Sequence, residues 1–244
     1  MCEPIGNRTQ LPAAPWGGAS PRELKTVHDP GICRLMLPLD LVRILAVGSL
    51  VATVGGFVLG RSLSHPSRGS VRVVARGDRG RWTEVVWVVG SLLVVLWPVG
   101  LLVAPAYAYH WPALPDFPDS AVLQLFGFSV ALAGGALFYT AARALGRHMT
   151  PAIQVQEDHR LVQDGPYRYV RHPVYTAILL GGSGLSLLYL SAALALIVLL
   201  LGGMALQRAR LEEELLSTPE AFGKSYREYA ARTGRFLPRI RSGP

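Results

Sequence analysis

Four long stretches of the chain are almost free of charged residues, and they constrain the fold more than any other feature. They cover residues 41–60, 85–106, 121–142 and 173–206. Because about 20 apolar residues cross a bilayer as a helix, the first three stretches each predict one span and the fourth predicts two tight ones, with a turn at Tyr189 and Ser191. The core of a soluble protein of 244 residues does not need this much apolar helix. The sequence therefore predicts an all-α, polytopic integral membrane protein with about five transmembrane helices.

The distribution of positive charge predicts how these helices are oriented. The formal net charge of +8 is compatible with nucleic-acid binding, but most Lys and Arg residues gather in segments 61–84, 143–172 and 207–244, and the loop 107–120 has none. Five spans place the three basic segments on one side, which the positive-inside rule assigns to the cytoplasm. The N-terminus is then outside, although its own basic residues do not fit this orientation. We attribute the charge to topology and to membrane lipids, and expect no nucleic-acid partner.

The chain divides into three regions. Residues 1–34 are rich in Pro, Gly and small polar residues, so we expect a disordered extension there. Residues 35–142 hold the first three spans, and residues 143–244 hold a loop, a helical hairpin and a C-terminal helix. Within the basic loop 61–84, the alternating sequence VRVVAR is compatible with a short strand, but a flexible loop at the membrane surface is favoured. The two cysteines lie in the N-terminal tail without metal-ligand spacing, so no metal is predicted.

Several residues have simple structural explanations. The glycines at 134–135 and 181–184 superficially resemble a phosphate-binding loop, but they lie inside lipid-length helices with no preceding strand. Close helix packing through small residues explains them better, and a Rossmann-type domain is not predicted. Trp82 and Trp87 lie near the end of a span, where aromatic residues usually anchor a helix at the membrane interface.

The stretch HRLVQDGPYRYVRHPVY, residues 159–175, is a polar island between two apolar segments. Polar groups next to a membrane span are costly, so this stretch is a candidate site. His172 precedes Pro173, and proline suits the first turn of a helix. His172 should therefore cap a helix N-terminus, where backbone N–H groups and the helix dipole favour an anion. A purely structural role for His172 and Tyr175, as interfacial capping residues, is an equally weighted alternative.

The C-terminal region contains a second group of charged residues. Its sequence keeps a helical period and predicts an amphipathic helix that follows the fifth span. Arg210 and Glu214 are four residues apart and share one face, as do Arg208 and Glu212. Solvated ion pairs worth only about 0.3 kcal/mol would explain both pairs. An arginine at the end of a span can also hold a carboxylate bidentately, and the spacing leaves both interpretations open.

Taken together, these segments resemble a known family. GPYRYVRHPVYT at 165–176, a helical hairpin and RLEEELLSTPEAFGKSYREYAARTGRFLP at 210–238 are similar to the isoprenylcysteine carboxyl methyltransferases and to the wider group that includes phospholipid methyltransferases. The resemblance covers about residues 143–240. It implies a methyltransferase that uses S-adenosyl-L-methionine, with a cofactor pocket built from the cytoplasmic loop and the C-terminal helix. Residues 143–244 would then be the catalytic region.

The resemblance also implies roles for individual residues. Arg210 matches the arginine at the methyl acceptor, and Glu214 matches a cofactor-binding glutamate, with Glu212 or Glu213 as alternatives if the register slips. Ala177 departs from the glycine that many relatives carry. The remaining positions that match cofactor contacts are Gln156, His159, Arg160, Leu161, Val162, Tyr167, His172, Pro173, Val174 and Tyr175.

The implied reaction is O-methylation of a carboxylate on a lipidic, isoprenylcysteine-like acceptor. A carboxylate is already nucleophilic at neutral pH, so the reaction depends on positioning more than on acid–base catalysis. We expect the cofactor to enter from the cytoplasm and the apolar acceptor to enter from the bilayer. Three alternatives stay open: methylation of a phospholipid or a small thiol on the same scaffold, an NADPH-dependent sterol-type reductase with a similar HPxY pattern, and a non-catalytic membrane scaffold.

Overall fold

A computed structural model describes residues 37–62, 73–76, 81–103, 120–150, 152–156 and 160–239. The predicted disordered extension, residues 1–34, lies outside this part of the chain. Helices dominate the described residues, as the sequence predicts. The long helices are α1 (Leu39–Ser62), α2 (Arg81–Val103), α4 (Ser120–Leu145), α5 (Pro173–Tyr189) and α6 (Ala192–Leu216). The shorter elements are β1 (Val73–Arg76), η2 (Gly146–His148), β2 (Gln154–Gln156), η3 (Gly165–Arg168) and α7 (Gly223–Arg232).

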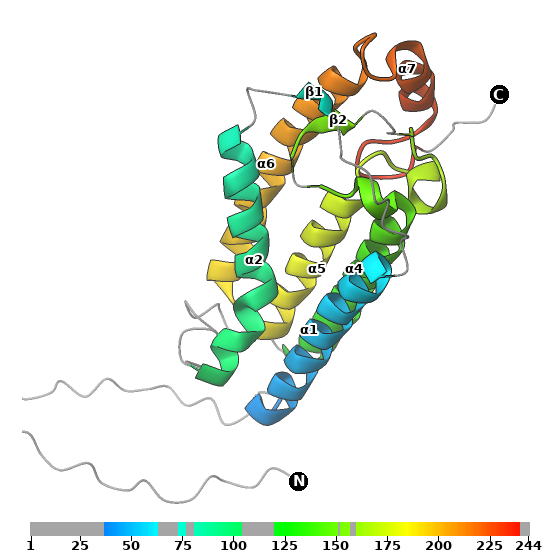
Figure 1. Ribbon diagram of the computed structural model, residues 1–244. Helices are drawn as coiled ribbons and strands as arrows, with labels where there is room; N and C mark the ends of the chain where they lie inside the picture. Colours follow the sequence, from blue (N-terminus) through cyan, green and yellow to red (C-terminus); the bar gives the residue numbers. More distant parts are fainter. Residues whose placement is uncertain are drawn as a thin grey trace, which may run out of the picture.

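The five long helices form a closed ring (Figure 1). Helix α1 packs on α4, α4 on α5, α5 on α6, α6 on α2, and α2 returns to α1. The ring brings helices that are far apart in sequence around one interior. The ring surrounds a central space that stays partly open to the outside.

The hairpin between α5 and α6 follows the predicted turn. Helix α5 ends at Tyr189, and Leu190 adopts a left-handed conformation with φ of 49°. Ser191 then caps α6, because its side chain accepts a hydrogen bond from the backbone N–H of Leu194 at 3.3 Å. The apolar stretch 173–206 is therefore two helices, as expected.

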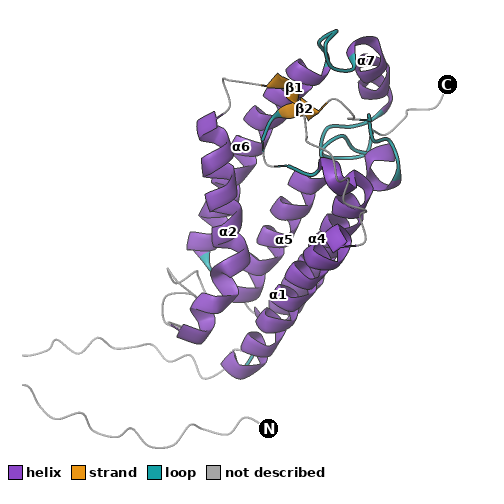
Figure 2. Cartoon of the chain, viewed as in Figure 1, coloured by secondary structure: helices purple, strands orange, loops and turns teal. Residues whose placement is uncertain are grey.

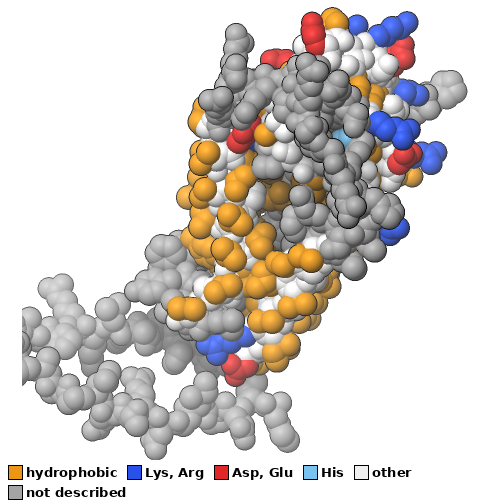
Figure 3. Space-filling model, viewed as in Figure 1, with side chains coloured by type: hydrophobic (Ala, Val, Ile, Leu, Met, Phe, Trp, Pro, Cys, Tyr) orange, Lys and Arg blue, Asp and Glu red, His pale blue; other side chains and the backbone are white. Residues whose placement is uncertain are grey.

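Within the described part of the chain, three helices are long and apolar enough to cross a membrane, over Trp82–Gly100, Ser120–Leu145 and Ala192–Leu216. Helix α5 is a shorter apolar helix, and α1 occupies the first predicted stretch, so the expected number of five spans is not established. Large apolar side chains are exposed on the outer surface of the bundle, and Figure 3 shows them over its middle, with charged side chains towards the ends. Examples are Val51, Val89, Phe126, Leu199 and Leu200. Such a surface suits the lipid environment of a membrane protein.

Strands β1 and β2 lie at the same end of the bundle as α7 (Figure 2). Strand β1, from the loop that follows α1, pairs antiparallel with β2, from the loop that follows α4. The favoured prediction of a flexible loop at VRVVAR is therefore wrong for Val73–Arg76, because pairing with a second loop satisfies the backbone groups of this strand. The pairing agrees with the prediction that both loops share one side of the membrane.

Small residues allow α4 and α5 to approach each other closely. A Cβ atom on Gly184 would lie 2.3 Å from the backbone nitrogen of Ala131, and one on Gly134 would lie 2.5 Å from that of Gly181. Neither backbone can move aside without separating the helices. The interpretation as packing residues is therefore confirmed for Gly134 and Gly184, whereas a Cβ on Gly181 would meet nothing within 4 Å.

We expect Gly184→Ala to destabilise the bundle by about 1–3 kcal/mol, the usual cost of overpacking a tight core. Thermal unfolding in detergent measures this effect. Gly181→Ala on the same helix is the matched control, because a Cβ there meets nothing within 4 Å. Equal melting temperatures for the two variants would contradict the proposed role of the α4–α5 contact.

Candidate active site

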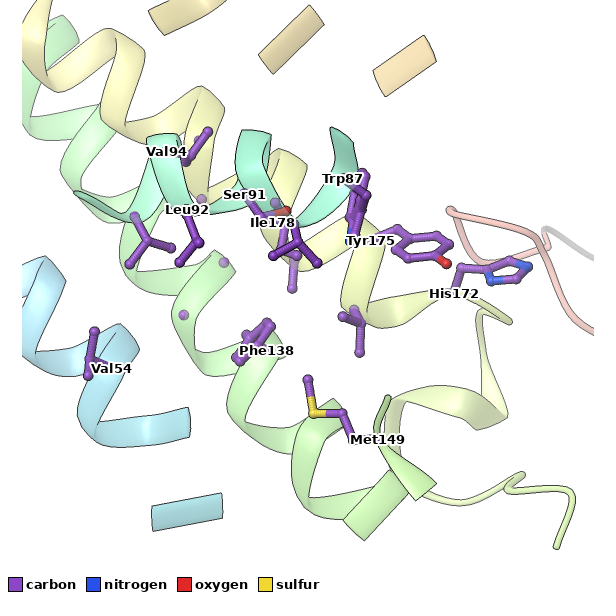
Figure 4. A pocket seen from close by; sticks show the side chains of 18 of the residues that line it. Val54, Trp87, Ser91, Leu92, Val94, Phe138, Met149, His172, Tyr175 and Ile178 are labelled. Carbon is purple, nitrogen blue, oxygen red and sulfur yellow. The ribbon is translucent and has the colours of Figure 1, made fainter. Parts of the chain in front are cut away.

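A cavity of about 520 Å³ lies inside the ring of helices (Figure 4). Most of its wall is apolar and comes from α1, α2, α4 and α5, including Val54, Leu92, Phe138 and Ile178. The polar end, towards which His172 and Tyr175 lie in Figure 4, is formed by a few charged and hydroxyl-bearing side chains. These are Tyr167, Arg171, His172, Tyr175, Arg208 and Glu212. The cavity is thus amphipathic along its length.

Helix α6 provides the carboxylate that lines this polar end. Tyr175 donates a hydrogen bond from its hydroxyl to Glu212 Oε2 at 3.0 Å, and His172 Nδ1 lies 3.5 Å from the same oxygen. The rings of His172 and Tyr175 are stacked, with centroids 5.4 Å apart. His172 is the N-cap residue of α5, as predicted, with Pro173 in the first turn. Its imidazole makes no capping bond and is directed to α6 instead.

The neighbouring Glu213 connects three basic side chains. Arg235 binds it bidentately, with Nε to Oε1 at 3.0 Å and Nη2 to Oε2 at 2.6 Å. Arg171 Nε donates to Oε1 at 3.0 Å, and His172 Nε2 lies 3.1 Å from that oxygen. Glu213 therefore joins α6 to the residues before α5 and to the C-terminal region, so its carboxylate is already engaged by protein groups.

Residues 233–236, which we call the closing segment, pack against the start of α5. The backbone N–H groups of Arg171 and His172 donate to the carbonyls of Gly234 and Arg235 at 2.8 and 3.1 Å. Thr176 Oγ1 donates to the Phe236 carbonyl at 3.0 Å. Because this segment also provides Arg235 to Glu213, it joins the start of α5 to α6 beside the polar end of the cavity.

Helix α2 contributes two side chains that sequence analysis did not place in the site. Trp87 is only 5% exposed and packs edge-on against the Tyr175 ring, with centroids 4.7 Å apart. Its interpretation as an interfacial anchor is wrong, because the ring faces the cavity. Trp82, in contrast, is exposed, as an anchor should be. Thr83 is fully buried and accepts a hydrogen bond from Arg208 Nη1 at 3.2 Å.

Cationic side chains outnumber carboxylates at the polar end. Three arginines lie there, Arg171, Arg208 and Arg235, but only two carboxylates, those of Glu212 and Glu213. Burial opposes a positive charge on the His172 imidazole, but its hydrogen bonds to the two glutamates outweigh this effect and raise its pKa above the ordinary value. The site therefore carries a surplus of positive charge, which suits an anionic ligand group.

The raised pKa of His172 predicts how stability depends on pH. The charged imidazole stabilises the folded state fully below its unfolded pKa of 6.5, and this contribution is lost as the pH rises through the higher folded value. We expect the melting temperature of wild type to fall as the pH rises from about 6 to about 9, and His172→Asn to show a flatter profile. His148→Asn serves as the control, and a profile for His172→Asn as steep as that of wild type would contradict this assignment.

The structure brings together only some of the residues that the resemblance assigns to the cofactor. Tyr167, His172, Val174 and Tyr175 line the cavity. Pro173 is buried beside them. Arg160 is exposed, Leu161 and Val162 are half-buried, and none of these three is among the lining residues. Gln156 ends strand β2, and His159 lies outside the described residues.

The predicted pair Arg210 and Glu214 is exposed, whereas Arg208 and Glu212 line the cavity. The two pairs differ by two residues, which is about 200° around an α-helix, so they lie on opposite faces of α6. The geometry therefore favours the second pair, whose i,i+4 spacing is equally visible in the sequence. Arg171 lies within the candidate stretch 159–175 but was given no role, and Arg235 was missed. They lie next to the HPxY and FLP segments, but no spacing rule marks them.

Comparison with known proteins gives one family. The model of the isoprenylcysteine carboxyl methyltransferase (ICMT) family matches residues 126–218. The chain is 32% identical to protein-S-isoprenylcysteine O-methyltransferase B of Arabidopsis thaliana, over 46% of this chain and 58% of the relative. It is 30% identical to protein-S-isoprenylcysteine O-methyltransferase of Xenopus laevis, over 52% and 44%. The chain thus spans about half the length of these two relatives.

A bacterial relative is matched over a larger share of both chains. The cobalt-zinc-cadmium resistance protein CzcN of Cupriavidus metallidurans is 37% identical over 73% of this chain and 73% of its own length. A solved structure of the eukaryotic intramembrane Ras methyltransferase ICMT aligns with a TM-score of 0.49 and 21% identity, over 83% of this chain and 74% of that chain.

Proposed function

Because the chain belongs to the isoprenylcysteine carboxyl methyltransferase family, we propose that it is a membrane methyltransferase that uses S-adenosyl-L-methionine to methylate the carboxylate of a lipidic, isoprenylcysteine-like acceptor. The observation that carries this proposal is the amphipathic cavity, which is apolar along most of its length and positively charged at one end. A hydrocarbon chain would fill the apolar part, and the carboxylate would lie at the charged end.

Arg208 is the residue that we assign to the acceptor carboxylate. It lines the cavity, it is 2% exposed, and a guanidinium can bind a carboxylate with two parallel hydrogen bonds. Because Arg208 is buried, this interaction would be stronger than one on the protein surface. This assignment replaces Arg210 by the arginine on the inward face of the same helix turn.

The residues at the polar end also fit the cofactor. When bound, S-adenosyl-L-methionine would supply an electrophilic methyl group on a positively charged sulfur. Glu212 lines the cavity and is the carboxylate best placed to balance a cationic group of the cofactor. Aromatic faces from Trp87, Tyr167 and Tyr175 surround the same space and can contact a sulfonium through cation–π interactions. Glu213, which is held by two arginines, would serve to position His172.

The chemistry requires little from the protein beyond alignment. The acceptor carboxylate is ionised at neutral pH, so no side chain has to remove a proton before its oxygen bonds to the methyl carbon. The side chains would hold the two reacting groups in line, which can supply most of the rate enhancement of a bimolecular reaction. With an acceptor bound, the apolar wall and the hydrocarbon chain would limit the access of water to the reacting groups.

We place the polar end on the cytoplasmic side of the membrane. The strand pair β1–β2, α7 and the closing segment lie at the end of the bundle that carries the basic loops (Figure 1). The positive-inside rule assigns this end to the cytoplasm, where the cofactor is made available, while the acceptor would enter sideways from the lipid.

A transfer assay with methyl-tritiated S-adenosyl-L-methionine tests this proposal. Purified protein in lipid nanodiscs is incubated with N-acetyl-S-farnesylcysteine, a farnesylated peptide, phosphatidylethanolamine or a small alkyl thiol. Mild base releases labelled methanol from a methyl ester but not from methylated amines or thioethers. Base-labile label on either farnesyl acceptor is the expected result. Label only on phosphatidylethanolamine or the thiol would overturn the choice of acceptor, and no label with any of them, together with binding of NADPH, would overturn the proposed activity.

A further inference from the structure

The hydroxyl group of Thr83 contacts Arg208, which lines the charged end of the cavity, although Thr83 belongs to a part of the chain that the family model does not match. The matched residues are 126–218, and they include Arg208 but not α2. Thr83 is fully buried in the first turn of α2, and its Oγ1 accepts the hydrogen bond from Arg208 Nη1 at 3.2 Å. Helix α2 thus contacts the guanidinium to which we assign acceptor binding.

The Thr83–Arg208 contact belongs to one face of α2, and this face packs against residues of the polar end. Thr83 and Trp87 are four residues apart and therefore lie one above the other on the same side of the helix. Trp87 packs against the Tyr175 ring, while Thr83 bonds to Arg208. Tyr175 and Arg208 both line the cavity. One helix face therefore holds an aromatic and a cationic group of the site.

A hydroxyl group at position 83 can fix the orientation of the Arg208 guanidinium. An arginine side chain has many rotamers, so a guanidinium that must meet a carboxylate in two parallel bonds gains from a contact that fixes its plane. The group has five N–H donors, which allows it to bond to Thr83 and to a carboxylate at the same time. The neutral hydroxyl accepts a hydrogen bond without cancelling the positive charge, as a carboxylate in the same place would.

We propose that Thr83 is a positioning residue that orients Arg208 for the carboxylate of the acceptor, and so helps the site to select an acid over its methyl ester. This inference rests on the proposed function, since it takes Arg208 as the acceptor-binding arginine. It adds a determinant of acceptor recognition from α2, outside the matched region.

The test compares Thr83→Val, which removes the hydroxyl at nearly constant shape, with Thr83→Ser, which keeps it. Each protein is assayed for methyl transfer to N-acetyl-S-farnesylcysteine, and for binding of this acid and of its methyl ester in nanodiscs without turnover. We expect Thr83→Val to lose about tenfold in kcat/KM for the acceptor and a similar factor in its preference for acid over ester, the loss expected for one hydrogen bond to a charged group. The KM for S-adenosyl-L-methionine should stay unchanged, and Thr83→Ser should resemble wild type.

Thr140→Val is the matched control, because Thr140 lies on the exposed face of α4 and bonds only to carbonyls of its own helix among the described residues. An unchanged acid preference in Thr83→Val, or an equal loss in Thr83→Ser, would overturn the inference. A parallel loss for acid and ester alike would also overturn it, since that result indicates a packing role. Failure of the proposed function has a different outcome: wild type would transfer no methyl group to the acid, while the binding measurement would still report on Thr83.

Discussion

Arg208→Ala is expected to abolish methyl transfer, while Arg210→Ala retains most of the wild-type rate. Arg208 lines the cavity at 2% exposure, so its loss removes the cation that faces the acceptor and leaves Glu212 without a neighbouring positive charge on its own helix. Truncating one partner of a buried, hydrogen-bonded charge pair in a complex typically costs about 3–5 kcal/mol, which corresponds to a fall of roughly 150- to 5,000-fold in kcat/KM. Arg210 is exposed, and its removal should have little effect.

Arg208 and Arg210 allow a well-matched comparison, because they lie two residues apart on the same helix and carry the same charge. Arg208→Lys provides a further control: it keeps the charge but loses the bidentate geometry, so an intermediate rate is expected. Binding of S-adenosyl-L-methionine, measured by calorimetry, should be nearly the same in all three variants. If Arg210→Ala is inactive and Arg208→Ala is active, the assignment from family resemblance is right and the assignment from geometry is wrong.

The helices could be predicted from the sequence because a bilayer-spanning helix has a simple requirement, a long apolar run. That requirement located the long helices and the turn at Tyr189–Ser191. The strand pair β1–β2 was missed, because it depends on two loops that meet only after the helices have packed. Local alternation in VRVVAR is too short to predict such a partner.

The site was predicted only in part, and the reason is geometric. His172 and Tyr175 were expected together because the HPxY segment marks a helix N-terminus, and both line the cavity. The face of α6 that turns inward was not fixed by the sequence, since Arg208–Glu212 and Arg210–Glu214 have the same spacing. Only the packing of α6 against α2 and α5 decides between them. Thr83 and Trp87 were missed because their role depends on contacts with residues about 90 or more positions away.

The second large effect is expected at Glu213, the carboxylate that joins the closing segment to the rest of the site. Glu213→Gln removes the charge that holds Arg171, His172 and Arg235 together. We expect a loss of about 2–4 kcal/mol in stability, less than for a fully buried pair because the Arg235 side chain is 34% exposed. For a chain of this size, this corresponds to a drop of roughly 5–15 °C in melting temperature.

Activity should fall together with stability in Glu213→Gln, because detachment of the closing segment also frees His172, whose backbone N–H is held by the Arg235 carbonyl. Glu214→Gln is the matched control on the exposed face of α6 and should change the stability by less than about 0.5 kcal/mol. A double-mutant cycle with Arg235→Gln separates the network from a simple loss of charge: residues in one ion-pair network are non-additive, so the second substitution should cost much less in the Glu213→Gln background. Additive effects would show that Arg235 stabilises the fold independently of Glu213, and that the closing segment is held in place by its backbone hydrogen bonds.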